Sequence, residues 1–241
     1  MRIPRLYADI PLAPQQIVEL PEDSSHYLSK VLRLTEGAAL TLFNGQGGYY
    51  DGEIQRISKK SVSVLLTQQH TIEHESPLHT HLGIAISKGD RMEWVMQKAT
   101  ELGINQITPL ISQRIELKLK GERLEKKLQH WQKIAISACE QSGRNQVPTV
   151  NKLLPIDQWL STVQAEKKLV LHHRNNQTLN ANESINSVAL LIGPEGGLTE
   201  DEINNAVQCG FDALQLGPRV LRTETAPLVA LTLLQSLWGD I

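Results

Sequence analysis

Two segments of this chain each run from an apolar stretch, through a bend rich in glycine and proline, into the start of a helix. The first is Leu190–Glu202, which contains Gly-Pro-Glu-Gly-Gly, and the second is Leu216–Pro227, which contains Gly-Pro-Arg. Glycine lets the main chain approach a ligand closely, and turns at the ends of strands present free backbone groups to it. One such turn is an ordinary connection. Two turns that are close in the sequence favour a small-molecule pocket built largely from backbone.

Apolar strands and amphipathic helices alternate over residues 78–241. The strands are expected at residues 82–86, 104–111, 169–171, 188–192 and 213–216. Four helices are expected. The first begins after Asp90, with Glu93 as its capping partner, and the second spans 124–138 and ends near Gly143. The third begins at a Thr199–Glu202 capping box and ends at Gly210, and the fourth spans 226–238. This alternation predicts an α/β fold with a parallel sheet and crossover helices. Because the strands are continuously apolar, the sheet is expected to be buried on both faces.

The first 72 residues have a different pattern. Strands with period-two apolar spacing are expected at 39–43, 49–57 and 61–66, with a glycine-rich turn at 44–48. One helix is expected over 24–33, with Asp23 as its N-cap. Short strands with a single helix predict a small β-barrel. Because residues 71–80 are polar, the linker is placed there, between domains at 1–72 and 78–241.

Composition excludes several classes of protein. Of the 241 residues, 40% are hydrophobic and 21% charged, no apolar run approaches a membrane span, and residues 1–10 lack a signal-peptide core. Cys139 and Cys209 are far apart in expected helices, which indicates buried free thiols in the reducing cytoplasm. The net charge of −2 argues against a wholly basic nucleic-acid binder. The 11 basic and 7 acidic residues of 88–144 fit either a phosphate-binding patch or a solvated helical face.

Other ligand classes lack their motifs. No GxxxxGK[ST] occurs, and no GxGxxG follows a strand. His70, His74, His79 and His81 cluster around the linker without partner cysteines or an HExxH frame, so no metal site is expected. His172 directly follows an apolar strand, which suits either a ligand-binding position or an exposed loop.

Further motifs extend the pattern of the two glycine loops over the whole chain. They are Met1-Arg2-Ile3-Pro4-Arg5, His26-Tyr27-Leu28 with Val31-Leu32-Arg33, Lys88–Glu93, Lys98–Gly103, Glu140–Arg144 and Pro148. Together they resemble the RsmE family, S-adenosylmethionine-dependent methyltransferases of the SPOUT class that act on uridine N3 in 16S ribosomal RNA. The resemblance implies a PUA-like RNA-binding barrel over 1–72 and a trefoil-knotted methyltransferase domain over 78–241. It also implies a cytoplasmic homodimer whose partner is 16S rRNA in the small ribosomal subunit. The knot is implied by the resemblance alone, because threaded chains are rare.

The cofactor is assigned to the two loops and the strand before His172. Adenine needs an apolar slot and a few main-chain hydrogen bonds, and leucines beside glycines offer both. Matching the loops of the family, S-adenosylmethionine is expected at Leu171, His172, Leu191, Ile192, Gly193, Pro194, Glu195, Gly196, Gly197, Leu216, Gly217, Leu221, Thr223, Thr225 and Ala226.

Methylation of uridine N3 requires that the N3 proton leave and that the base edge be unpaired. Glu224 is the acid best placed by sequence to accept the proton, although it also suits the N-terminus of the last helix electrostatically. Arg222 is the candidate for stabilising the negative charge on the uracil. Arg219 and Arg222 also suit RNA phosphate or the cofactor's carboxylate.

Candidate RNA contacts are spread over both domains. The phosphate and base ligands expected are Arg5, His26, Arg33, Arg91, Arg144 and Arg219, and the stacking candidates are His26, Tyr27, Tyr49 and Tyr50. Two alternative functions remain at this stage. One is a knotted methyltransferase acting on another RNA base or on transfer RNA. The other is a non-catalytic RNA-binding or ribosome-assembly factor, against which the intact glycine loops argue.

Overall fold

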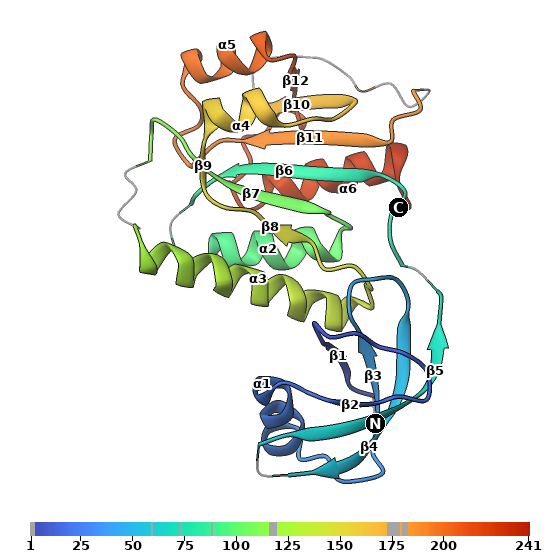
Figure 1. Ribbon diagram of the computed structural model, residues 1–241. Coiled ribbons are helices and arrows are strands. Elements are labelled where there is room, and N and C mark those ends of the chain that lie inside the picture. Colours follow the sequence, from blue (N-terminus) through green and yellow to red (C-terminus); the bar gives the residue numbers. More distant parts are fainter. Residues whose placement is uncertain are drawn as a thin grey trace. The chain divides into compact units, whose positions relative to one another are not determined.

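The chain forms two compact units, which are described separately (Figure 1). This computed structural model describes residues 3–58, 60–72, 74–87, 89–115, 120–172, 179 and 183–241. Unit 1 comprises Met1–Glu75 and Cys139–Val147, and unit 2 comprises Ser76–Ala138 and Pro148–Ile241. Residues 139–147 therefore group with unit 1, although they follow a long stretch of unit 2 in the sequence.

Unit 1 contains a five-stranded sheet in the order β1-β3-β4-β5-β2. Its strands are β1 (Arg5–Tyr7), β2 (Ile17–Glu19), β3 (Ala39–Phe43), β4 (Tyr49–Ile57) and β5 (Val62–His70). β1 pairs with β3 in parallel, and the other pairs are antiparallel. The predicted strands and the glycine turn between β3 and β4 are confirmed. β1 and β2 were not predicted, because three residues are too few to show a period-two pattern.

The helix of unit 1 is shorter and less regular than predicted. Residues 22–26 form α1 (Glu22–His26), and a π-helical turn, η1 (Tyr27–Val31), follows it directly. The expected Asp23 cap is wrong, because the N-cap position is Pro21 and no side chain caps the helix. Leu28 anchors this segment in the core of the unit. Arg33, just after it, has a positive φ of 53°.

Unit 2 is built on a parallel sheet, as predicted. Its main strand order is β12-β10-β11-β6-β7-β8, with β9 also pairing with β7, and all these pairs are parallel. The strands are β6 (His79–Ala85), β7 (Gln106–Ile111), β8 (Thr149–Val150), β9 (Leu154–Pro155), β10 (Lys167–Leu171), β11 (Ser187–Ile192) and β12 (Asp212–Leu214). β6 begins at His79, so His79 and His81 belong to a strand and the expected linker is shorter than 71–80.

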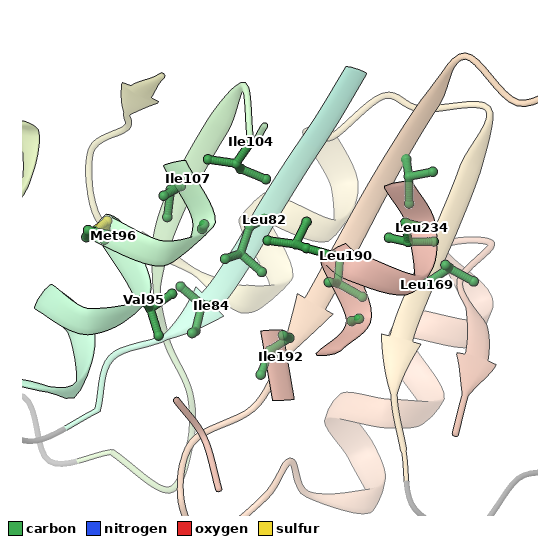
Figure 2. Close-up of a cluster of buried hydrophobic side chains, with 14 of the residues drawn as sticks. Leu82, Ile84, Val95, Met96, Ile104, Ile107, Leu169, Leu190, Ile192 and Leu234 are labelled. Atoms are coloured by element: carbon green, nitrogen blue, oxygen red, sulfur yellow. The ribbon is translucent and has the colours of Figure 1, made fainter. Parts of the chain in front are cut away.

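Helices cover both faces of this sheet. They are α2 (Arg91–Glu101), α3 (Glu122–Ser142), α4 (Ile156–Thr162), α5 (Glu200–Gln208) and α6 (Ala226–Trp238). Along β11, Leu190 and Ile192 pack in a cluster with side chains of α2 and α6 (Figure 2). The alternate residues, Ala189 and Leu191, pack with Trp159 of α4 and with α5. The prediction that continuous apolar strands are buried on two faces is therefore confirmed.

The helix starts fit the predictions unevenly. The Thr199–Glu202 capping box at α5 is present, with both hydrogen bonds made. Asp90 occupies the N-cap position of α2, but its side chain makes no capping hydrogen bond. Glu93, its expected partner, instead accepts a 2.7 Å hydrogen bond from Lys127 of α3. The predicted position of the cap is therefore confirmed, but the predicted capping hydrogen bonds are absent.

One titratable group is half-buried on the α4 face of the sheet. The ring of His81 lies edge-on to Trp159, whose indole N–H donates to His81 Nε2 at 3.3 Å. Thr108 Oγ1 lies 2.8 Å from the same nitrogen. Burial, and then the neighbouring His79, lower the pKa of His81 to about 4. The histidine is therefore neutral at physiological pH and part of the core packing.

The two cysteines were both expected to be buried. Cys139 is buried in α3, whereas Cys209 is half-buried at the C-cap of α5, and both are free thiols. Burial raises the pKa of Cys139 to about 12, so its thiol stays protonated. Its Sγ lies 3.5 Å from the carbonyl oxygen of Gln146.

Candidate functional site

The glycine loops of unit 2 form a single cavity. β10 and β11 are neighbours in the sheet, as are β10 and β12, so the loops after these three strands emerge at the same edge. The backbone N–H of His172, just beyond β10, donates to the carbonyl of Leu214 at 3.0 Å and holds two of the strand ends together. The cavity between them measures about 310 Å³, the size of a small-ligand pocket. It is lined by Leu171, His172, Ile192, Gly193, Pro194, Glu195, Gly196, Gly197, Leu198, Leu214, Gln215, Leu216, Gly217, Arg219, Val220, Leu221, Thr223 and Ala226.

Glycine is required in these loops for two different reasons. At Gly193 a Cβ atom would lie 2.8 Å from Cγ of Leu198, because the loop folds back on itself there. Gly197 and Gly217 have φ values of 70° and 79°, a region that residues with a Cβ rarely adopt. The Gly197 N–H also donates to the Pro194 carbonyl at 2.8 Å and closes the turn. The pocket wall on this side is thus main chain.

The pocket contains almost all of the residues that the sequence assigned to the cofactor. Leu191 and Thr225 are the exceptions. Leu191 faces the opposite side of the sheet, in the cluster beneath α4 and α5, because its neighbours Leu190 and Ile192 take the other face. Thr225 occupies the N-cap position of α6. Leu198, Leu214, Gln215 and Val220 also line the cavity and were not predicted.

A buried carboxylate fixes the first loop to the end of β7. Glu202 Oε2 accepts from the backbone N–H of Thr199 at 2.8 Å, and its Oε1 accepts from the N–H of Gln113 at 2.8 Å. Glu202 is almost fully buried, so these hydrogen bonds are little screened by solvent. They hold the segment that carries Arg114 beside the Gly-Pro-Glu-Gly-Gly loop.

A second cavity, which we call the charged cleft, adjoins the first. It measures about 910 Å³ and is more open. It is lined by Gly89, Asp90, Arg91, Trp94, Arg114, Glu195, Gly196 and Glu224. Glu195 and Gly196 line both cavities, so a group bound in one lies next to a group bound in the other.

Ion pairs organise the charged cleft. Arg91 Nη1 donates to Glu195 Oε1 at 2.7 Å, and Arg91 Nε lies 3.7 Å from Glu224 Oε2. Arg114 Nη1 donates to the carbonyl oxygen of Gly196. Glu224 Oε2 is buried, and no residue within the described ranges donates a hydrogen bond to it. A buried carboxylate oxygen without a donor is costly, so this atom is a strong acceptor for a ligand N–H.

The structure does not bring Arg222 into this arrangement. Its side chain is exposed and lines neither cavity, while its carbonyl oxygen accepts from the N–H groups of Thr225 and Ala226 at 2.9 Å each. The arginines that line the charged cleft are Arg91 and Arg114. Arg114 and Trp94 were not predicted as site residues from the sequence.

The candidate RNA ligands of unit 1 fall into two groups. Arg144 is only 3% exposed, and its guanidinium donates twice to Glu75, at 2.6 and 2.9 Å. Arg5 is half-buried over the ring of Phe43, with a 4.4 Å distance to its centroid. These two arginines hold the unit together, so the phosphate role expected for Arg144 does not fit its buried position. His26 and Arg33, by contrast, are exposed.

The aromatic candidates also divide. Tyr27 is exposed beside His26 on the π-helical turn. Tyr49 stacks on His70 with ring centroids 4.6 Å apart, and Tyr50 belongs to the core of unit 1. In unit 2, Arg219 is exposed at the rim of the glycine-lined pocket.

Two features are absent from the described residues. No three His, Cys, Asp or Glu side chains among them gather as a metal-binding group. None of the helices in those ranges combines the length and the apolar character needed to cross a membrane.

Comparisons with known proteins agree with this architecture. Residues 74–235 match the family described as RNA methyltransferase domain, and residues 20–67 match the RNA methyltransferase PUA domain. Fold and matched families together define an RNA methyltransferase with an N-terminal PUA domain.

Two relatives named ribosomal RNA small subunit methyltransferase E are similar over nearly the full length. The protein from Buchnera aphidicola of Schizaphis graminum is 40% identical, over 100% of this chain and 98% of its own. That from Bacillus subtilis is 35% identical, over 92% and 93%. The chain therefore belongs to the ribosomal RNA small subunit methyltransferase E family.

Solved structures give the same result. A putative methyltransferase from Legionella pneumophila, in complex with the bound cofactor SAM, is 43% identical with a TM-score of 0.95, and both chains are covered completely. A ribosomal RNA small subunit methyltransferase E from Neisseria gonorrhoeae, bound to S-adenosyl methionine, is 38% identical with a TM-score of 0.93, again over both complete chains. The predicted family, and the α/β fold with an N-terminal PUA-like domain, are thus confirmed. The trefoil knot stays a prediction.

Proposed function

We propose that this chain is an S-adenosylmethionine-dependent methyltransferase that methylates N3 of a uridine in the 16S rRNA of the small ribosomal subunit. The observation that carries the proposal is the pairing of two cavities. A glycine-lined pocket shares Glu195 and Gly196 with a cleft that holds a carboxylate oxygen lacking a donor. Relatives named for small-subunit rRNA methylation, and neighbours solved with the cofactor, support the assignment.

The glycine-lined pocket fits S-adenosylmethionine. Leu171, Ile192, Leu214 and Leu216 provide the apolar surface that an adenine ring needs. In the main-chain cradle at Gly193–Gly197 there is no room for a side chain at Gly193, where a Cβ would collide with Leu198. Arg219 at the rim suits the carboxylate of the methionine part. The other pocket residues that were predicted from the sequence are assigned to cofactor binding through their backbone groups. They are His172, Pro194, Glu195, Gly196, Gly197, Gly217, Leu221, Thr223 and Ala226.

The chemistry divides between cofactor and protein. Bound S-adenosylmethionine supplies an electrophilic methyl group. Glu224 accepts the N3 proton of the uracil, since the neutral imide is a poor nucleophile and Glu224 Oε2 has no other donor in the described structure. Arg91 Nε lies 3.7 Å from that oxygen, so a guanidinium faces the carboxylate from within the cleft.

The first test of this function is made on the RNA. Small-subunit rRNA from a strain lacking the gene is expected to lose one methyl group from one uridine, as read by mass spectrometry. Loss from another base or from transfer RNA would support a methyltransferase with a different target. Unchanged RNA, together with no calorimetric binding of S-adenosylmethionine, would leave a non-catalytic assembly factor.

We propose that residues 1–72 form the RNA-binding domain and residues 78–241 the methyltransferase domain. Exposed His26, Tyr27 and Arg33 support this for the first domain, because aromatic rings and a guanidinium group suit single-stranded RNA. Arg33→Gly removes the charge and suits the φ of 53°. It is expected to weaken RNA binding while leaving cofactor affinity unchanged. Gln15→Gly, at a φ of 62°, is the backbone control and is expected to change neither.

We also propose a homodimer, located in the cytoplasm. In α6 only one side is packed, by Ala230, Leu231 and Leu234, while apolar Val229 is 40% exposed. A helix that is apolar nearly all round needs cover on several sides. Light scattering at micromolar concentration is expected to give the dimer mass, and Val229→Glu to give the monomer. Val207→Glu, which replaces an exposed valine of α5, is the matched control, and a monomeric wild-type protein would refute the dimer.

A further inference from the structure

Trp94 lies in the charged cleft where no packing requirement explains it. It is 50% exposed, whereas Trp131 and Trp159 are each 1% exposed. It begins the second turn of α2, off the face formed by Met92, Val95, Met96 and Ala99, which packs into the core. Half of the indole is exposed and it lines the cleft among charged side chains, so a flat ring bound there can stack on it.

The surroundings of Trp94 fit a flat, polar ring. Lys98 Nζ lies 5.3 Å from the centroid of the indole, and Arg91 lies three residues before it in the same helix. The cleft it lines also holds Glu224, Arg114 and the shared loop residue Gly196. A base stacked on this indole would therefore lie beside the glycine-lined pocket.

The polar groups of the cleft match one base edge. The Watson–Crick edge of uracil presents the O2 acceptor, the N3–H donor and the O4 acceptor. The cleft offers guanidinium donors from Arg91 and Arg114 and one acceptor, Glu224 Oε2, to which no described residue donates. Cytosine presents an amino donor in place of O4 and a bare N3 acceptor, so two of its three groups would face like partners.

We propose that the charged cleft is the pocket for the target uracil, in which Trp94 stacks on the base and Arg91, Glu224 and Arg114 select uracil over cytosine. The proposal rests on the uridine methyltransferase function proposed above, and it assigns the base-binding residues. Stacking on an aromatic side chain is a general means of holding an unpaired base.

The test uses the whole protein and small subunits purified from a strain lacking the gene. Trp94→Ala is expected to lower kcat/KM for methyl transfer about tenfold to a hundredfold, the loss typical of one stacked base. Trp94→Phe is expected to restore most of it, while Trp94→Leu, which keeps apolar bulk without a π face, is not. Val207→Ala, a truncation of an exposed apolar side chain on α5, is the control and is expected to match wild type.

A second readout does not depend on turnover. Hexauridylate is expected to quench the tryptophan fluorescence of the wild-type protein more than hexacytidylate does. This quenching should be lost in Trp94→Phe. Calorimetry with S-adenosylmethionine should give the same affinity for wild type and all Trp94 variants.

The outcomes separate the two proposals. If wild type methylates small subunits and both Trp94→Ala and Trp94→Leu do so at the wild-type kcat/KM, the base pocket is refuted while the enzyme function stands. Equal quenching in wild type and Trp94→Phe also refutes it, and covers the case in which the other variants fail to fold. If wild type binds no S-adenosylmethionine and transfers no methyl group, the proposed function falls and the base pocket falls with it.

Discussion

The glycine-lined pocket and the charged cleft share two residues but are built by different means. The pocket is enclosed mostly by main chain from the loops at 193–198 and 215–223, with apolar side chains beneath. The cleft is formed by charged side chains and one exposed indole from four separate segments, around residues 89–94, 114, 195–196 and 224. A ligand that never varies can be held by backbone. A base that must be distinguished from similar bases needs side chains with defined donors and acceptors.

The largest expected effect tests the backbone cavity. Gly217→Val should abolish measurable binding of S-adenosylmethionine, because a β-branched residue at a φ of 79° is strained and its side chain enters the pocket. Gly210→Val is the matched control, since Gly210 has a φ of 84°, equally open surroundings and a place outside the pocket. Calorimetry should show wild-type affinity for the control. Equal losses in both variants would mean that fold strain, not the pocket, is measured.

The second effect concerns proton removal in the cleft. Glu224→Gln keeps the size of the side chain but removes the basic carboxylate, so kcat should fall about 10²–10⁴-fold. Cofactor affinity should stay unchanged, because Glu224 lines only the cleft. Full activity of this variant at pH 7 would assign Glu224 to the start of α6 instead.

The third effect compares two arginines. Arg114→Ala removes a donor from the cleft and is expected to lower kcat about 10²–10³-fold. Arg222→Ala removes an exposed side chain and is expected to lower it less than about tenfold, within the range of a single rim charge. Single-turnover methyl transfer with both variants makes the comparison. A larger loss for Arg222→Ala would restore the role expected from the sequence.

The smallest effect lies away from both cavities, in the sheet that supports them. His81 has a folded pKa of about 4 against an ordinary 6.5, so between these values the unfolded chain binds a proton that the folded chain does not. Stability is therefore complete above pH 6.5 and falls by about 3 kcal/mol as the pH drops towards 4. Denaturant unfolding of wild type and His81→Gln should show a shallower pH dependence in the variant over this window. His26→Gln, at an exposed position of α1, serves as the control, and identical slopes in all three proteins would contradict the assignment.

These two cavities also differ in how well the sequence predicted them. The pocket was predicted because its glycines and leucines lie in two short segments, each of which can be recognised from neighbouring residues in the sequence. The cleft was predicted only at Arg91, Glu195, Gly196 and Glu224, because its parts meet through the order of strands in the sheet. Trp94 did carry a signal, since it is an aromatic residue off the apolar face of its helix. Arg114 carried none.

Burial of charged residues was the least predictable property. Arg144 looked like a phosphate ligand in the sequence, but its partner Glu75 is 69 residues away and only the fold brings them together.

Leu191 was assigned to the pocket because it lies within the motif, but successive residues of a buried strand face opposite sides of the sheet, and Leu191 faces away from the pocket. The α4 helix was missed because seven residues give too short a periodic pattern.

Unit 1 is assembled from two stretches of chain, and this limits how relatives can be recombined. Glu75 accepts hydrogen bonds from Arg144, Asn145 and Gln146, and Glu140 accepts from the backbone of Tyr7. Residues 1–75 transplanted alone into another scaffold would leave the buried partners of these groups behind. A chimera of two relatives should therefore take residues 1–75 and residues 139–147 from the same parent, so that each buried group keeps its hydrogen-bond partner.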